Sequence, residues 1–67
     1  MTFDDWCRQN NLKNTEVGRR LGASRVAVHY WRTGIHRPNP NYTELIGELT
    51  AGAVTAIDLQ RAYQAAR

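Results

Sequence analysis

The sequence predicts an all-α protein, a compact bundle of five helices, from three observations. Apolar residues recur at spacings of three and four, whereas the strict alternation of a half-buried strand is never sustained. Capping residues, glycines and prolines divide the 67 residues into five such segments. The chain is 42% hydrophobic, which suits one modest core. We therefore expect a single domain over residues 1–67.

The first helix is predicted over Phe3–Gln9. Thr2 has the side chain of a helix N-cap, and Asp5 follows it at the spacing of a capping pair. Asn10 and Asn11 are expected to end this helix.

The second and third helices are predicted to be close neighbours in the chain. The second begins near Asn14, its expected N-cap, and ends at Gly22, where a left-handed residue is needed. Ser24 is the expected N-cap of the third helix, and Gly34 closes it. Because only Gly22 and Ala23 separate the two helices, their connection is a tight turn.

Two prolines predict an extended surface loop over Ile35–Pro40. The pair Asn41 and Glu44 then predicts the start of a fourth helix, and Ala51 and Gly52 predict its end. The core face of this helix is expected to comprise Leu45, Ile46 and Leu49.

A fifth helix is predicted after Thr55, with Asp58 as its third helical residue. Apolar residues recur along it at spacings of three and four, and Ile57 flanks them. This stripe could form a dimer interface, or it could pack on the body of the domain. Its residues are Leu59, Ala62, Tyr63 and Ala66.

Residues 14–33 have the spacing of a helix-turn-helix. Two helices that cross at a wide angle need a small residue where they approach and a glycine in the turn, which Gly18 and Gly22 supply. Gly18 costs about 1 kcal/mol relative to alanine inside a helix, and close approach of the neighbouring helix would explain it. An apolar wedge between the helices is expected from Val17, Leu21, Val28 and Trp31.

The segment VGRRLGASRVAVHYWRTG resembles the helix-turn-helix of the phage Cro and repressor family, whose members often read LARRLGVSRxAVSxWxxG. The segment ELTAGAVTAIDLQRAY is similar to the YdaS-like antitoxin and small phage regulator branch of that family. The resemblance implies a five-helix homodimer that represses its own operon from a pseudo-palindromic operator. The chain departs from the family at Val26, where glutamine is common, and at His29, where a small hydroxyl residue is common.

The outward face of the third helix is the predicted reading surface. If Val28 and Trp31 face inward, the opposite face points outward at about 100° per residue. Residues near the start of a recognition helix reach base edges. Arg25 is the strongest candidate, because its guanidinium can donate two hydrogen bonds to guanine O6 and N7. The predicted base-reading residues are Arg25, Val26, His29 and Tyr30.

Phosphate contacts are expected at the edges of the motif, where small polar side chains and backbone amides anchor the protein on the groove rim. The resemblance places Asn14 where the family often has a glutamine for this purpose. The predicted phosphate-contacting residues are Asn14, Ser24, Thr33, His36 and Arg37.

The charge distribution agrees with a polyanion binder. From Lys13 to Arg37 six basic residues oppose only Glu16, a net charge of +5. The rest of the chain has three basic and five acidic residues, a net charge of −2. A concentrated basic segment is typical of nucleic-acid binding, although a solvated helix face would look the same.

Other classes of site find little support. Cys7 is the only cysteine and is expected to be a buried free thiol. No orienting group or oxyanion-binding loop accompanies it, so an enzyme is not expected. His29 and His36 have no acidic or thiol companion at ligand spacing, so we expect no metal and no cofactor.

We therefore expect a DNA-binding transcriptional regulator whose partners are double-stranded DNA and a second copy of the chain, without a small-molecule substrate. No apolar run approaches the roughly 18 residues of a membrane span and no signal peptide is recognised, so the expected location is the cytoplasm. The alternative is a protein-interaction module, an antitoxin or phage accessory protein whose arginines meet an acidic protein surface.

Overall fold

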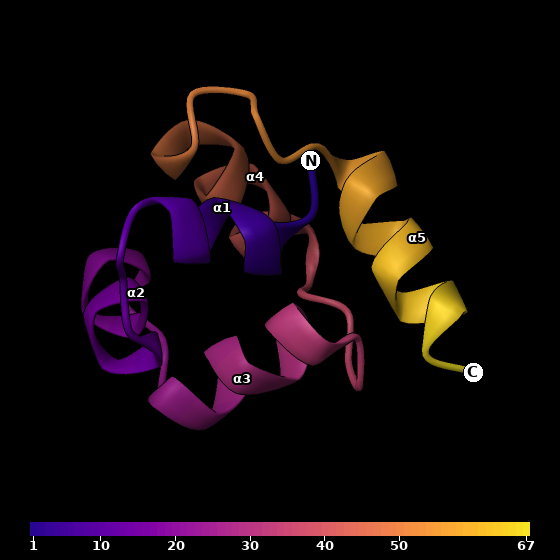
Figure 1. Ribbon diagram of the computed structural model, residues 1–67, viewed down its shortest axis with the longest axis horizontal. Coiled ribbons are helices and arrows are strands. Elements are labelled where there is room, and N and C mark those ends of the chain that lie inside the picture. Colours follow the sequence, from indigo (N-terminus) through magenta and orange to yellow (C-terminus); the bar gives the residue numbers. More distant parts are fainter.

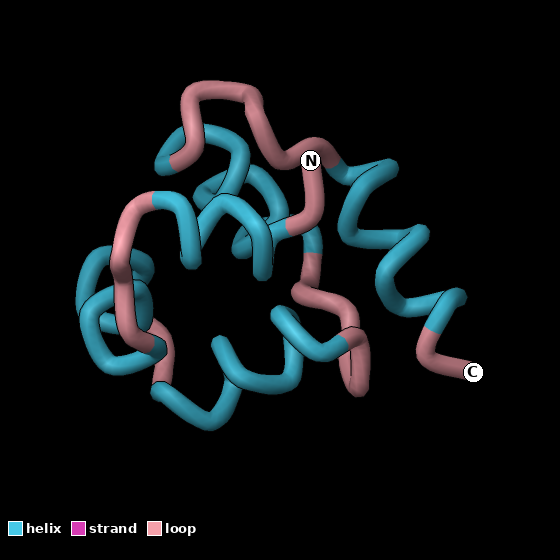
Figure 2. The backbone as a smooth tube through the Cα atoms, in the orientation of Figure 1, coloured by secondary structure: helices cyan, strands magenta, loops and turns pink.

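The computed structural model describes residues 1–67 and contains five helices and no strands, which confirms the predicted fold class. Figures 1 and 2 show the helices gathered around one centre, with the C-terminal end of α5 beside the loop that follows α3. None of the helices combines the length and the apolar composition needed to cross a membrane. The helices are α1 (Phe3–Gln9), α2 (Asn14–Leu21), α3 (Arg25–Thr33), α4 (Pro40–Leu49) and α5 (Ala56–Ala65).

Three predicted N-caps are confirmed by their hydrogen bonds. Thr2 Oγ1 accepts a hydrogen bond from the backbone N–H of Asp5 at 3.0 Å, and Ser24 Oγ accepts one from Ala27 at 3.0 Å. At the start of α5, Thr55 and Asp58 form a complete capping box. Each bond satisfies an amide that has no partner within its own helix.

Two other helix starts differ from the prediction. Lys13 is the N-cap of α2 and makes no side-chain capping bond, so Asn14 is the first helical residue. Asn39 is the N-cap of α4 and accepts from the N–H of Tyr42 at 2.9 Å, so the predicted start at Asn41 is wrong. Pro40 is the first residue of α4. Proline suits this position because a residue there needs no N–H donor, and proline has none.

The core is a single cluster to which all five helices contribute. Cys7 is fully buried within it, as predicted, and burial raises the pKa of its thiol to about 11. Leu45 was expected in this core, but it is 40% exposed, because the face of α4 that points inward is centred on Ile46. The cluster comprises Phe3, Cys7, Val17, Leu21, Val28, Trp31, Ile46, Val54 and Leu59.

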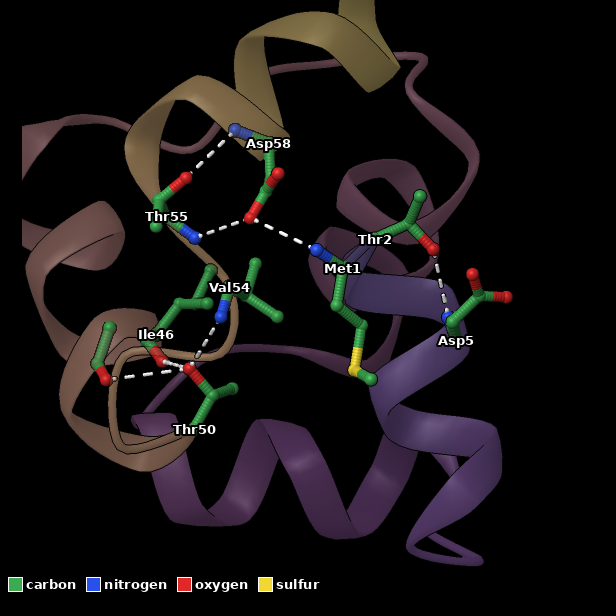
Figure 3. A network of polar contacts seen from close by, with 9 residues as sticks. Met1, Thr2, Asp5, Ile46, Thr50, Val54, Thr55 and Asp58 are labelled. Carbon is green, nitrogen blue, oxygen red and sulfur yellow. Dashed lines mark hydrogen bonds and ion pairs between the residues drawn. The ribbon is translucent and has the colours of Figure 1, made fainter.

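The turn between α4 and α5 is held by one buried hydroxyl (Figure 3). Thr50 Oγ1 donates to the carbonyl of Ile46 at 2.8 Å and accepts from the N–H of Val54 at 3.1 Å. The chain reverses between them through Ala51 and Gly52, both in the left-handed region. The hydroxyl of Thr50 therefore supplies the hydrogen-bond acceptor for the buried N–H of Val54.

The first residue of the chain contacts the start of α5 (Figure 3). Asp58 Oδ2 accepts from the backbone N–H of Thr55 at 2.9 Å and lies 3.4 Å from the amino group of Met1. The Thr55 amide is the main reason that the pKa of the Asp58 carboxyl is lowered from its ordinary value.

Candidate nucleic-acid interface

Helices α2 and α3 pack against each other through the predicted apolar wedge. Its four residues are all buried, and α2 makes its most extensive helix contact with α3. Because Val28 and Trp31 fix the inward face of α3, the opposite face is turned to solvent. The wedge consists of Val17, Leu21, Val28 and Trp31.

The turn between these helices depends on two glycines. Gly22 adopts φ +73° and ends α2, as predicted. A Cβ atom at Gly18 would lie 2.5 Å from the carbonyl oxygen of Ala23. The close approach at Gly18 is therefore made by the backbone of the turn, and the expectation that α3 itself makes it is corrected.

Helix α4 braces the same turn, which the sequence reasoning missed. The hydroxyl of Tyr42 donates to the carbonyl of Gly22 at 3.1 Å. The ring of Tyr42 packs on Trp31, with 4.9 Å between the ring centroids. Tyr42 thus fixes both the turn and the inward face of α3. A tyrosine next to an apolar helix face was the only sequence signal for this role.

The structure brings the four predicted base-reading residues together with the start of α2. Arg25 and His29 are exposed, Val26 is 47% exposed and Tyr30 is partly buried. Together with Asn14 and Thr15 of α2 they line a concave surface, which encloses a depression of about 480 Å³. The predicted base-reading residues of α3 and the predicted phosphate-contacting residue Asn14 of α2 therefore share one concave surface.

Arg32 connects α3 to α1 and α2 through its guanidinium group. Its Nη2 lies 2.8 Å from Asp4 Oδ1 of α1, and its Nη1 donates to Asn14 Oδ1 of α2 at 2.8 Å. The same Nη1 also lies 3.5 Å from the carbonyl oxygen of Leu12. Asn14 is consequently held by its side-chain oxygen and offers its amide N–H groups to a partner. Arg32 was counted in the basic segment, but its guanidinium is paired with Asp4, which also pairs with Arg8.

The cations that remain in the basic segment have no acidic partner. The ion pairs of the chain involve the amino group of Met1, Arg8 and Arg32. The other basic side chains between residues 13 and 37 are all exposed, so their charge is open to solvent. They are Lys13, Arg19, Arg20, Arg25 and Arg37.

The hydroxyls of Ser24 and Thr33, both predicted to contact phosphates, differ in whether their hydrogen is free to donate. Ser24 Oγ accepts a hydrogen bond as the N-cap of α3, which leaves its hydrogen free to donate. Thr33 Oγ1 donates to the carbonyl of His29 at 2.8 Å, so a bond from Thr33 to a phosphate would have to replace this contact.

The other two predicted phosphate-contacting residues lie in the loop after α3. The ring of His36 packs edge-on against Tyr30, with centroids 4.9 Å apart. Arg37 donates from Nη1 to Gln60 Oε1 of α5. Both side chains are exposed, and both are placed by contacts within the chain.

The apolar stripe of α5 packs mainly on the body of the domain. Leu59 is 5% exposed and belongs to the core, so its suggested role in a dimer interface is corrected. The carbonyl of Ala62 and the Cβ of Ala66 lie where a side chain at Gly34 would project, so α5 crosses the end of α3 closely. Tyr63 is partly buried beneath two arginines, and Ile57 is exposed.

No protein-family model, curated protein or solved structure matches this chain. No group of three histidine, cysteine or acidic side chains is close enough to hold a metal ion. The chemistry of the concave surface is instead that of exposed hydrogen-bond donors and unpaired positive charge.

Proposed function

We propose that the protein is a sequence-specific DNA-binding regulator that places α3 in the major groove, with α2 and α3 acting as a helix-turn-helix. The observation that carries the proposal is the concave surface shared by α2 and α3. It presents Arg25, Val26 and His29 beside the start of α2, as a recognition helix next to an anchoring helix would require. The resemblance of residues 17–34 to the Cro and repressor motif favours the same function.

The chemistry of this surface fits a base edge and its flanking phosphates. Arg25 has no acidic partner, so both edges of its guanidinium are available to guanine. Val26 is an exposed apolar side chain, which suits contact with a thymine methyl group. Asn14 lies across the same concavity with its side-chain oxygen already bonded to Arg32, so its amide hydrogens are the groups that it offers to a phosphate.

We further propose that two copies bind together and repress the operon that encodes them. One recognition helix covers too few base pairs for useful specificity, so two half-sites about one helical turn apart are expected. Because Leu59 is buried, the contact between the copies would have to use other residues.

Selection from a random-sequence duplex pool with the purified chain tests this function. The expected result is an enriched motif with inverted symmetry, and sedimentation of the complex should give two chains per duplex. Failure to enrich any motif over the starting pool would contradict sequence-specific binding. In that case a protein partner for the same surface becomes the better interpretation.

A further inference from the structure

Two arginines that are distant in the sequence share one aromatic ring. The guanidinium carbon of Arg67 lies 3.9 Å from the centroid of the Tyr63 ring, and that of Arg37 lies 5.1 Å from it. A tyrosine ring attracts each cation through its electron-rich face. The two cations repel each other, however, so their proximity favours an anion beside them.

Neutral hydrogen-bond acceptors hold both guanidinium groups in place. Arg67 donates from Nη2 to the carbonyl oxygen of Ile35 at 2.7 Å, and Arg37 donates to the side-chain oxygen of Gln60. Neither arginine has an acidic partner. Because each guanidinium has five N–H groups, most of its donors remain free for a ligand.

This cluster lies at the far end of α3 from Arg25. Arg37 belongs to the loop after α3, and the bond from Arg67 to Ile35 places Arg67 against the same loop. Figure 1 shows the C-terminus of the chain beside this loop and the end of α3. A helix in the major groove has phosphates along both rims, so a cationic pair at this end of α3 would meet a rim.

We propose that Arg37, Arg67 and Tyr63 form a clamp for a DNA backbone phosphate at the C-terminal end of α3. The inference rests on the proposed function and adds to it Arg67, which lies outside the basic segment of the sequence. The two guanidinium groups donate to the phosphate oxygens, and the ring of Tyr63 sets their separation. Such a contact does not depend on base sequence.

The salt dependence of binding tests the clamp. The probe is a fluorescein-labelled random-sequence duplex, and anisotropy gives the affinity of the full chain over a series of KCl concentrations. Each phosphate contact contributes about 0.9 to the slope of log K against log salt. Because both arginines of the clamp meet one phosphate, Arg37→Ala combined with Arg67→Ala should lower the magnitude of that slope by about 0.9, and Arg67→Ala alone should lower it by part of that amount. Arg61→Ala is the matched control and should leave the slope unchanged, because Arg61 lies on the opposite side of α5 from Tyr63.

The role of the ring is tested by two substitutions of Tyr63. Tyr63→Phe retains the aromatic face and should bind the duplex as the wild type does. Tyr63→Leu removes that face and should weaken binding at every salt concentration, while thermal melting checks that both variants are folded. Equal affinity of the two variants would refute the role of the ring.

The outcomes distinguish this inference from the function on which it rests. If Arg67→Ala keeps the wild-type slope while the wild type binds DNA, the clamp is wrong and the reading role of α3 stands. If the wild type binds no duplex, the proposed function fails and the clamp fails with it.

Discussion

Arg32 and Asp4 join α3 to α1 through two contacts, since both Nε and Nη2 of Arg32 lie within 2.9 Å of Asp4 Oδ1. The side chain of Arg32 is only 14% exposed, so its charge is largely removed from water. The same guanidinium binds Asn14, and α2 is therefore positioned through this pair. An ion pair of α1 thus contributes to the shape of the surface formed by α2 and α3.

Asp4→Ala should destabilise the fold by about 1–2 kcal/mol, because Arg32 would keep its charge at a partly buried position without an acidic partner. Urea denaturation followed by circular dichroism measures this loss. Arg8→Ala is the matched control, since Arg8 also pairs with Asp4 but its side chain is 75% exposed. It should cost less than about 0.5 kcal/mol, and an equal loss in both variants would contradict the role of Arg32.

Gly18→Ala should destabilise the protein by about 2 kcal/mol or more, because the new Cβ would meet the Ala23 carbonyl oxygen at 2.5 Å. Gly47 is the natural control, since it is also inside a helix and a Cβ there meets no atom within 4 Å. Gly47→Ala should stabilise the protein by up to about 1 kcal/mol. In thermal or urea unfolding, the midpoint of Gly18→Ala should fall below that of the wild type and the midpoint of Gly47→Ala should rise above it.

Substitution of Arg25 should affect specific binding above all. Arg25→Ala is expected to cost about 1–3 kcal/mol on the selected site and to relax preference at one base pair. Arg37→Ala should weaken binding to selected and random duplexes by the same factor, because a phosphate contact does not read sequence. Affinity titrations on both duplexes check this, and equal losses on both duplexes for Arg25→Ala would refute its reading role.

Asp58 should make stability depend on acidity. Its pKa is lowered in the folded chain, chiefly by the Thr55 amide, so the carboxylate stabilises the fold above pH of about 4. This contribution is lost as the pH falls through the folded-state pKa. Asp58→Asn should be less stable than the wild type at neutral pH, and the difference should shrink in acid.

A pH series of urea melts measures the effect of Asp58. Asp5→Asn is a suitable comparison, because Asp5 follows Thr2 at the same spacing but its carboxylate makes no hydrogen bond (Figure 3). A stability difference between the wild type and Asp58→Asn that does not change with pH would contradict the assignment.

Cys7 should resist thiol reagents while the chain is folded. Its side chain is fully buried and its pKa is raised to about 11, so at neutral pH almost no thiolate is present or accessible. Reaction with a disulfide reagent should follow the unfolded fraction as urea is increased. Rapid modification in the absence of urea would show that the space around α1 is open.

Elements that depend on near neighbours were predictable from the sequence. The caps at Thr2, Ser24 and Thr55 each act on an amide three residues later, so their partners are visible within one turn of helix. The start of α4 was misjudged because Asn41 and Glu44 imitate a capping pair. The backbone uses Asn39 and Pro40 for the same purpose.

Contacts between distant segments were not predictable. Arg32 could not be separated from the solvated arginines, because its partner Asp4 lies 28 residues away and nothing in the local spacing links them. The partners of Tyr42 and Tyr63 depend likewise on how α4 and α5 cross α3. The outward residues of α3 followed from helical periodicity alone, whereas their common surface with Asn14 needed the three-dimensional arrangement.

The division of α3 into two faces has a consequence for how this protein can diversify. Val28 and Trp31 hold the helix in the core, whereas Arg25, Val26 and His29 contribute little to that core. Substitutions at the outward positions can therefore accumulate with little penalty in stability. A lineage, or a laboratory library, could explore new ligand preferences on this helix while the scaffold stays the same.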